Sequence, residues 1–190
     1  MRTKQLLPMT ATVLLFLLGY TPLCHGQQIQ INDCTYKLGM LEREAEIETS
    51  KHGILNKNGD NGERPITNIP FESGEVDRIE VYGTLTFSGG RLVKMEKHWL
   101  LQQRENTAAD VASAIDAAVT SATGGLPRAC LVQAITTSEP ETDYKETFIS
   151  CQRPGYSREV AIYTKVMRLG GKQFKPTFVT ESLEKAGLTK

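Results

Sequence analysis

The chain of 190 residues carries 22 basic and 22 acidic side chains, so its formal net charge is zero. A protein that holds nucleic acid through phosphate contacts needs a surplus of positive charge on one face, and this composition offers no such surplus. The length suits one domain with a substantial hydrophobic core, and no internal repeat divides it.

Residues 1–26 follow the pattern of a secretory signal peptide. Arg2 and Lys4 form a positive start, an apolar run covers residues 11–20, and Gly26 is a small residue suited to the position before a cleavage site. The apolar run is short for a helix that spans a bilayer. We therefore predict a secreted or periplasmic protein with no stable membrane anchor after cleavage. The alternatives are an uncleaved anchor and a lipoprotein.

Residues 27–74 are predicted to form an N-terminal arm with one possible helix and a loop-rich end. The alternating Gln-Ile-Gln-Ile run within residues 27–33 indicates a short strand or an ordered arm. Residues 36–50 are rich in Glu, Leu and Ala at roughly helical spacing, which favours an amphipathic helix over a solvated strand. Turn-forming residues crowd 56–62. A calcium loop starting here would need glycine where Asn61 stands and glutamate where Thr67 stands, so we predict a solvated loop.

The strongest pattern in the chain is a β-hairpin over residues 78–101. Apolar and polar side chains alternate on both sides of the Ser-Gly-Gly break at 88–90. A three-residue loop at this break places Leu85 opposite Val93, whereas a two-residue loop would place Leu85 opposite Lys94. We therefore predict the three-residue loop.

A helix is predicted over residues 107–122. Thr107 and Asp110 resemble a capping box with Asp in place of the usual Glu or Gln, and a glycine pair at 124–125 marks the end. Its apolar positions recur at helical spacing: Val111, Ala114, Ile115, Ala118 and Ala122. Because this face is mostly alanine, the helix is expected to approach a sheet closely.

A three-stranded meander is predicted next, with strands at residues 129–137, 144–151 and 158–167. If Cys130 lies opposite Cys151, then Val132, Ile149 and Val160 form one apolar row across the three strands. This register predicts a disulfide between Cys130 and Cys151 that contributes roughly 3 kcal/mol. Cys34 is then an unpaired thiol. The rival arrangement pairs Cys34 with one of the other two cysteines.

These elements predict an α+β fold in which the hairpin and the meander form one antiparallel sheet with the helix packed across a face. The core domain is expected at residues 75–169, and residues 170–190 are a C-terminal tail with a possible short helix capped by Thr180 or Ser182. The element order is similar to that of roadblock/longin-type modules and, more loosely, of cystatin-like folds. This similarity rests on no residue motif and implies no function.

The sequence offers few residues for catalysis or for metal binding. His52 and His98 are the histidines beyond the signal region, and no nucleophile elbow, phosphate loop or dinucleotide motif occurs. The cysteines and histidines are too widely spaced for a zinc site, so we expect no cofactor and no metal. The candidate ligand contacts are Trp99, His98 and Tyr82, because a tryptophan on a hairpin can line a cleft between the hairpin and a helix.

The combined pattern predicts an exported, non-enzymatic α+β module that binds a protein or a small ligand. One alternative is a small secreted hydrolase with a spatially assembled site near His98. Another is a secreted enzyme inhibitor that inserts a loop, at residues 56–62 or 138–143, into its target.

Overall fold

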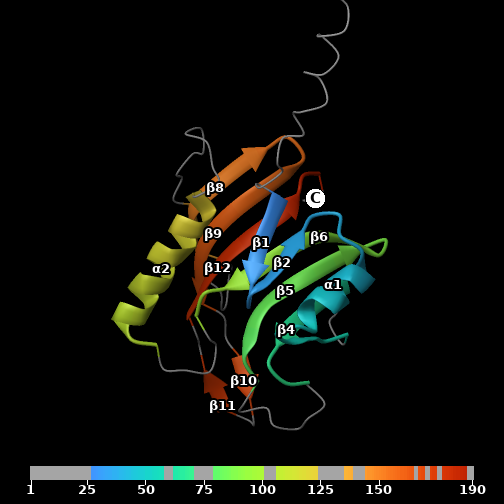
Figure 1. Ribbon diagram of the computed structural model, residues 1–190. Helices are drawn as coiled ribbons and strands as arrows, with labels where there is room; N and C mark the ends of the chain where they lie inside the picture. The colour runs from blue at the N-terminus through green and yellow to red at the C-terminus, as the bar shows by residue number, and fades with distance from the viewer. Residues whose placement is uncertain are drawn as a thin grey trace, which may run out of the picture.

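A computed structural model describes residues 27–57, 62–70, 79–100, 106–123, 135–138, 144–164, 167–169, 172–174 and 177–187 (Figure 1). The predicted signal peptide lies outside these residues. Within the described ranges, no helix has both the length and the apolar character needed to cross a membrane.

The dominant feature is an eight-stranded antiparallel sheet with the strand order β3-β4-β5-β6-β12-β9-β8-β7. Its strands are β3 (Ile54–Leu55), β4 (Glu63–Thr67), β5 (Val81–Ser88), β6 (Arg91–His98), β7 (Ile135–Ser138), β8 (Tyr144–Arg153), β9 (Tyr156–Thr164) and β12 (Thr177–Lys185). Two separate hairpins pair β1 (Gln28–Ile31) with β2 (Cys34–Lys37) and β10 (Met167–Leu169) with β11 (Lys172–Phe174). The helices are α1 (Glu42–Thr49) and α2 (Ala108–Thr123). The predicted mix of helices and a large antiparallel sheet is confirmed, although the sheet has more strands than the hairpin and the meander supply.

The predicted short helix at the C-terminus is wrong. The segment forms β12, which pairs with β6 on one side and with β9 on the other. Leu, Glu, Lys and Ala are good helix formers, and they suggested a helix from local propensity alone. Pairing on both sides outweighs that propensity, because a central strand gains two ladders of hydrogen bonds and buries its side chains.

One face of the sheet is covered by α2 and by the β1–β2 hairpin, which Figure 1 shows side by side in front of it. Val179 and Leu183 share a face of β12 because alternate residues of a strand point the same way. Val179 packs in the cluster under α2, and Leu183 packs in the cluster under β1–β2. The helix α1 lies on this side too, since Arg64 of β4 binds Glu42 of α1 at 3.2 Å.

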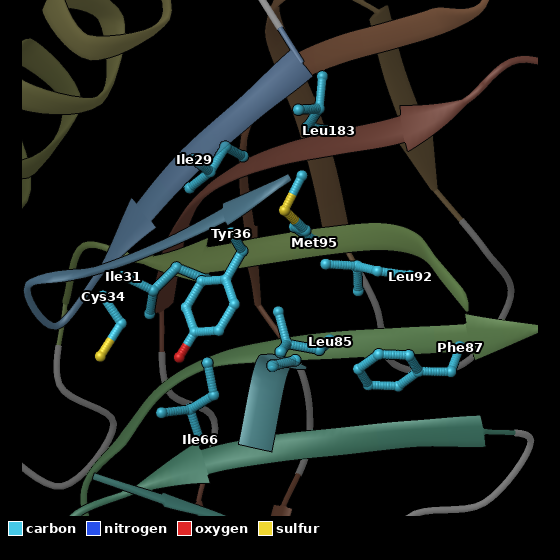
Figure 2. Packing of buried hydrophobic residues seen from close by; sticks show 11 residues of the cluster. Ile29, Ile31, Cys34, Tyr36, Ile66, Leu85, Phe87, Leu92, Met95 and Leu183 are labelled. Atoms are coloured by element: carbon cyan, nitrogen blue, oxygen red, sulfur yellow. The ribbon is translucent and has the colours of Figure 1, made fainter. Parts of the chain in front are cut away.

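The larger hydrophobic cluster lies between β1–β2, α1 and the strands β4, β5, β6 and β12. Figure 2 shows the Tyr36 ring of β2 over Leu85 and Ile66 of the main sheet. The Tyr36 hydroxyl lies 2.8 Å from the Thr49 hydroxyl, which donates to the Ala45 carbonyl oxygen at 2.7 Å. These buried polar groups are therefore satisfied inside an apolar cluster.

The β5–β6 hairpin is confirmed, but its predicted loop is wrong. Ser88 pairs with Arg91, so the turn has two residues, Gly89 and Gly90, with φ of 58° and 73°. A bulge beside Phe87 shifts the register by one residue, so that Leu85 lies opposite Met95. The bulge removes the mismatch that the two-residue loop implied, because an extra residue returns the following side chains to the core face.

The helix α2 and its capping box are confirmed. The Thr107 backbone N–H donates to Asp110 Oδ2 at 2.8 Å, and the Asp110 backbone N–H donates to Thr107 Oγ1 at 3.2 Å. Ala114, Ala118 and Ala122 are the buried residues of α2, as the spacing predicted.

The meander is confirmed in part. Cys151 pairs with Arg158 and Ile149 with Val160, as predicted, whereas a bulge moves Thr147 from the expected Ile162 to Ala161. Between β7 and β8 the partner of Thr147 is Ile135, one residue beyond the predicted Ala134.

The structure tests one of the two predicted disulfide arrangements, the one that involves Cys34. Cys34 is buried and free, which excludes the pairings that involve it. Cys151 is 1% exposed on β8. Cys130 lies outside the described residues, so its pairing with Cys151 stays a prediction.

In the N-terminal arm, the predicted strand is β1, and the predicted helix is shorter than expected. Cys34–Lys37 forms β2 instead of the first helical turn, and the helix begins at Glu42. Asn32 and Asp33 connect β1 to β2 with φ of 46° and 62°, a left-handed turn that asparagine and aspartate tolerate well. The strands β3 and β4 were not predicted.

Candidate functional site

The end of β6 carries the candidate ligand contacts on opposite faces of the sheet. Trp99 packs with the cluster under α2, and its backbone N–H donates to the Val179 carbonyl oxygen at 2.9 Å. His98 contacts the ring of Phe178 on the other face. Tyr82 of β5 donates to Glu80 Oε2 at 3.2 Å. The structure therefore does not bring Trp99 and His98 into one site, and ligand binding by any of the three residues stays a prediction.

His98 belongs to a cluster of polar and aromatic side chains, which we call the Glu96 cluster: Glu96, His98, Tyr163 and Phe178. His98 Nε2 lies 3.2 Å from Glu96 Oε1, and the Tyr163 hydroxyl donates to the same oxygen at 3.3 Å. Phe178 stacks on Tyr163 with 4.7 Å between ring centroids. The cluster joins β6, β12 and β9 on the face opposite α2.

The electrostatics of the cluster keep Glu96 ionised. Burial acts to raise the pKa of Glu96, but the hydrogen bond and the charge of His98 act against it. Lys94 Nζ, 3.8 Å from Glu96 Oε2, and the Tyr163 hydroxyl also favour the charged carboxylate. The net result is a pKa of Glu96 below its ordinary value.

In a hydrolytic triad, a carboxylate orients the histidine that acts as the general base, and the Glu96–His98 contact has this arrangement. The His98 side chain is only 6% exposed, however. A general base must reach the proton that it abstracts from a substrate or from a nucleophile. Thr180, the hydroxyl residue that faces His98 across the β6–β12 pair, is also buried. The geometry is that of a structural hydrogen-bond network.

A second polar cluster lies on the covered face and was not anticipated from the sequence. Arg158 Nε donates to Glu181 Oε1 at 2.9 Å, and the Arg158 guanidinium reaches the Ser121 carbonyl oxygen of α2 at 3.4 Å. Glu181 is fully buried, and its Oε2 has no hydrogen-bond partner among the described residues. Glu181 thus ties β12 to β9, and Arg158 ties both strands to α2.

Lys97 extends this cluster on β6. It lies opposite Glu181 in the strand pairing, and its Nζ is 3.6 Å from the centre of the Trp99 ring. Burial lowers the pKa of Lys97, while the negative charges of Glu181 and Asp33 oppose that shift. Lys97 therefore satisfies its charge against the π face of Trp99 and the nearby carboxylates. Val179, Glu181 and Leu183 alternate along the sequence and therefore share one face of a strand. Interpreting this segment as a strand would have placed Glu181 on the core face.

In the part of the chain that the structure describes, no group of three or more His, Cys, Asp or Glu side chains is arranged to hold a metal ion. Comparison of the chain with protein-family models, with curated proteins and with solved structures gives no match.

Proposed function

We propose that the protein is an exported, non-enzymatic module that binds a positively charged protein surface through the sheet face opposite α2. We call this surface the acidic face. It is defined by residues that share the side of Glu96 in the strand register: Thr84, Thr86, Lys94, Glu96, Glu159, Ser182 and Glu184.

The observation that carries the proposal is the charge of this face. Of these seven residues, three are glutamates and one, Lys94, is a lysine. All of them are partly exposed, since α1, α2 and the β1–β2 hairpin lie on the other side of the sheet. Hydroxyl side chains of Thr84, Thr86 and Ser182 separate the charges. A basic partner gains both charge complementarity and hydrogen bonds on such a surface.

The test is chemical cross-linking in the native compartment, followed by affinity purification and mass spectrometry. The double variant Glu159→Gln/Glu184→Gln removes two charges from the acidic face. Asp116→Asn removes a charge from the exposed side of α2 and is the matched control. We expect a stoichiometric partner with the wild type and with the control, and a several-fold loss with the double variant. Raised salt should weaken the capture as well, because it screens exposed charges.

A hydrolase is the second candidate, and the Glu96–His98 contact is the observation in its favour. A panel of ester and peptide substrates tests it, with His98→Gln as the control variant. Turnover that His98→Gln abolishes, while the folded state is retained, would replace the binding proposal. The inhibitor alternative concerns residues 56–62 and 138–143, most of which lie outside the described residues, and assays of protease inhibition test it.

A further inference from the structure

We propose that the exported protein begins at Gln27 and that this residue is converted to pyroglutamate. The inference rests on the proposed export and adds a modification site to it. Gln27 follows Gly26, the residue suited to the position before the cleavage site.

The fold is compatible with cleavage at this bond. Gln28 is the first residue of β1 and pairs with Lys37, and Ile29 is only 3% exposed. The Gln27 carbonyl oxygen accepts a hydrogen bond from the Leu38 backbone N–H at 3.1 Å. Cleavage after Gly26 keeps this bond and the whole of β1. Cleavage one residue later would remove the acceptor, and cleavage after Gln28 would shorten the strand.

A free N-terminal glutamine has the chemistry for ring closure. The α-amino nitrogen attacks the Cδ carbonyl carbon of the same side chain. The new C–N bond closes a five-membered lactam, the bond between Cδ and the side-chain nitrogen breaks, and ammonia leaves with the proton from the amine. The reaction needs no oxidant, no reductant and no second substrate.

The structure is compatible with this reaction, because the fold binds the backbone carbonyl oxygen of Gln27, and this oxygen does not react. The hydrogen bond from Leu38 uses the backbone carbonyl of Gln27. The lactam forms from the α-amine and the side-chain amide, which leaves that carbonyl oxygen available. Ring closure removes the positive terminal charge. It also blocks aminopeptidases, which require a free α-amine.

The experiment is secretion of the full-length chain, immediate acid quenching to stop further cyclisation, and mass spectrometry of the N-terminal peptide. We expect a peptide that starts at position 27 and is lighter than the unmodified sequence by one ammonia. It should also resist aminopeptidase. Gln27→Ala should give a free, unmodified N-terminus, and Gln28→Ala should leave the modification in place.

Two results would overturn the inference, and they have different meanings. A peptide that starts with unmodified Gln27 contradicts cyclisation and leaves export standing. A chain that retains residues before Gln27, or that starts beyond it, contradicts the cleavage site. If such a chain also stays inside the producing cell, the proposed export fails with it.

Discussion

At the scale of single residues, the Arg158–Glu181 pair is the most deeply buried of the described ion pairs. Both side chains are buried away from water, and each balances the charge of the other. Loss of one partner of a buried pair leaves an uncompensated charge, which typically costs about 3–5 kcal/mol. Replacement of both partners by apolar residues of similar size is often neutral or stabilising.

We therefore expect Glu181→Leu to lower the free energy of unfolding by about 3–5 kcal/mol, and Arg158→Met/Glu181→Leu to recover part of the loss, because Lys97 still lacks the carboxylate opposite it. Urea unfolding followed by the fluorescence of Trp99, the single tryptophan of the chain, measures both. Equal losses in the single and the double variant would show that the ion pair is not what the site requires.

Glu96 gives a second residue-scale prediction, on pH. Because its pKa is lowered in the folded state, the ionised Glu96 stabilises the fold above its ordinary pKa of about 4.3. This contribution is lost as the pH falls through the lowered, folded-state pKa. We expect Glu96→Gln to destabilise the protein at pH 7, and the difference from the wild type to shrink in acid. A difference that grows below about pH 4 would contradict this assignment.

At the scale of elements, the contact of α2 with the sheet depends on small side chains. Ala118 has no exposed surface between α2 and the strands β9 and β12. A larger side chain at this position must push the helix away from the sheet, at a cost of about 1–3 kcal/mol. Ala112 is exposed on the same helix and is the matched control.

We expect Ala118→Leu to lower the midpoint of thermal unfolding by several degrees and Ala112→Leu to leave it nearly unchanged. Circular dichroism of both variants measures this. If Ala118→Leu unfolds at the temperature of the wild type, α2 does not pack as closely as its alanine face indicates.

The elements that the sequence predicted are those with a local signature. The capping box of α2, the position of the β5–β6 turn (though not its length) and the alternation of β5 are each contained within a few residues. The misses have non-local causes. The bulge beside Phe87 is set by the pairing of two strands, and β4 carries Pro65 and two charged residues at an outer part of the sheet. No local pattern distinguishes these features from loop.

At the scale of the whole molecule, β12 joins two halves of the sheet that lie far apart in sequence. It pairs with β6 on one side and with β9 on the other. Its Val179 packs in the cluster under α2, and its Leu183 packs in the cluster under β1–β2. Without β12, two strands in the middle of the sheet would become edges with unpaired backbone groups.

We expect deletion of residues 177–190 to abolish cooperative unfolding and to cause aggregation, whereas deletion of residues 188–190, beyond the end of β12, should be tolerated. Size-exclusion chromatography with thermal unfolding of both proteins measures this. A monomeric, cooperatively folded product of the larger deletion would contradict the central position of β12.

The same non-local pairing explains why the candidate site was only partly visible in the sequence. His98 and Trp99 stood out as rare residue types, but their neighbours Tyr163, Phe178 and Glu181 come from strands that the fold brings to β6. The acidic face depends on β12 being a strand between β6 and β9. The interpretation of that segment as a helix therefore concealed both polar clusters.

The most direct test of the proposed function is the labelling of Lys94 by an amine-reactive reagent, in the native compartment and in the purified protein. Lys94 lies on the acidic face with a side chain 39% exposed, while Lys51 and Lys57, at 55% and 69%, both lie beyond the end of α1. A partner on the acidic face should reduce labelling of Lys94 several-fold in the native compartment and leave Lys51 and Lys57 unchanged. Equal labelling of Lys94 in both settings would contradict the proposal that a partner occupies this face.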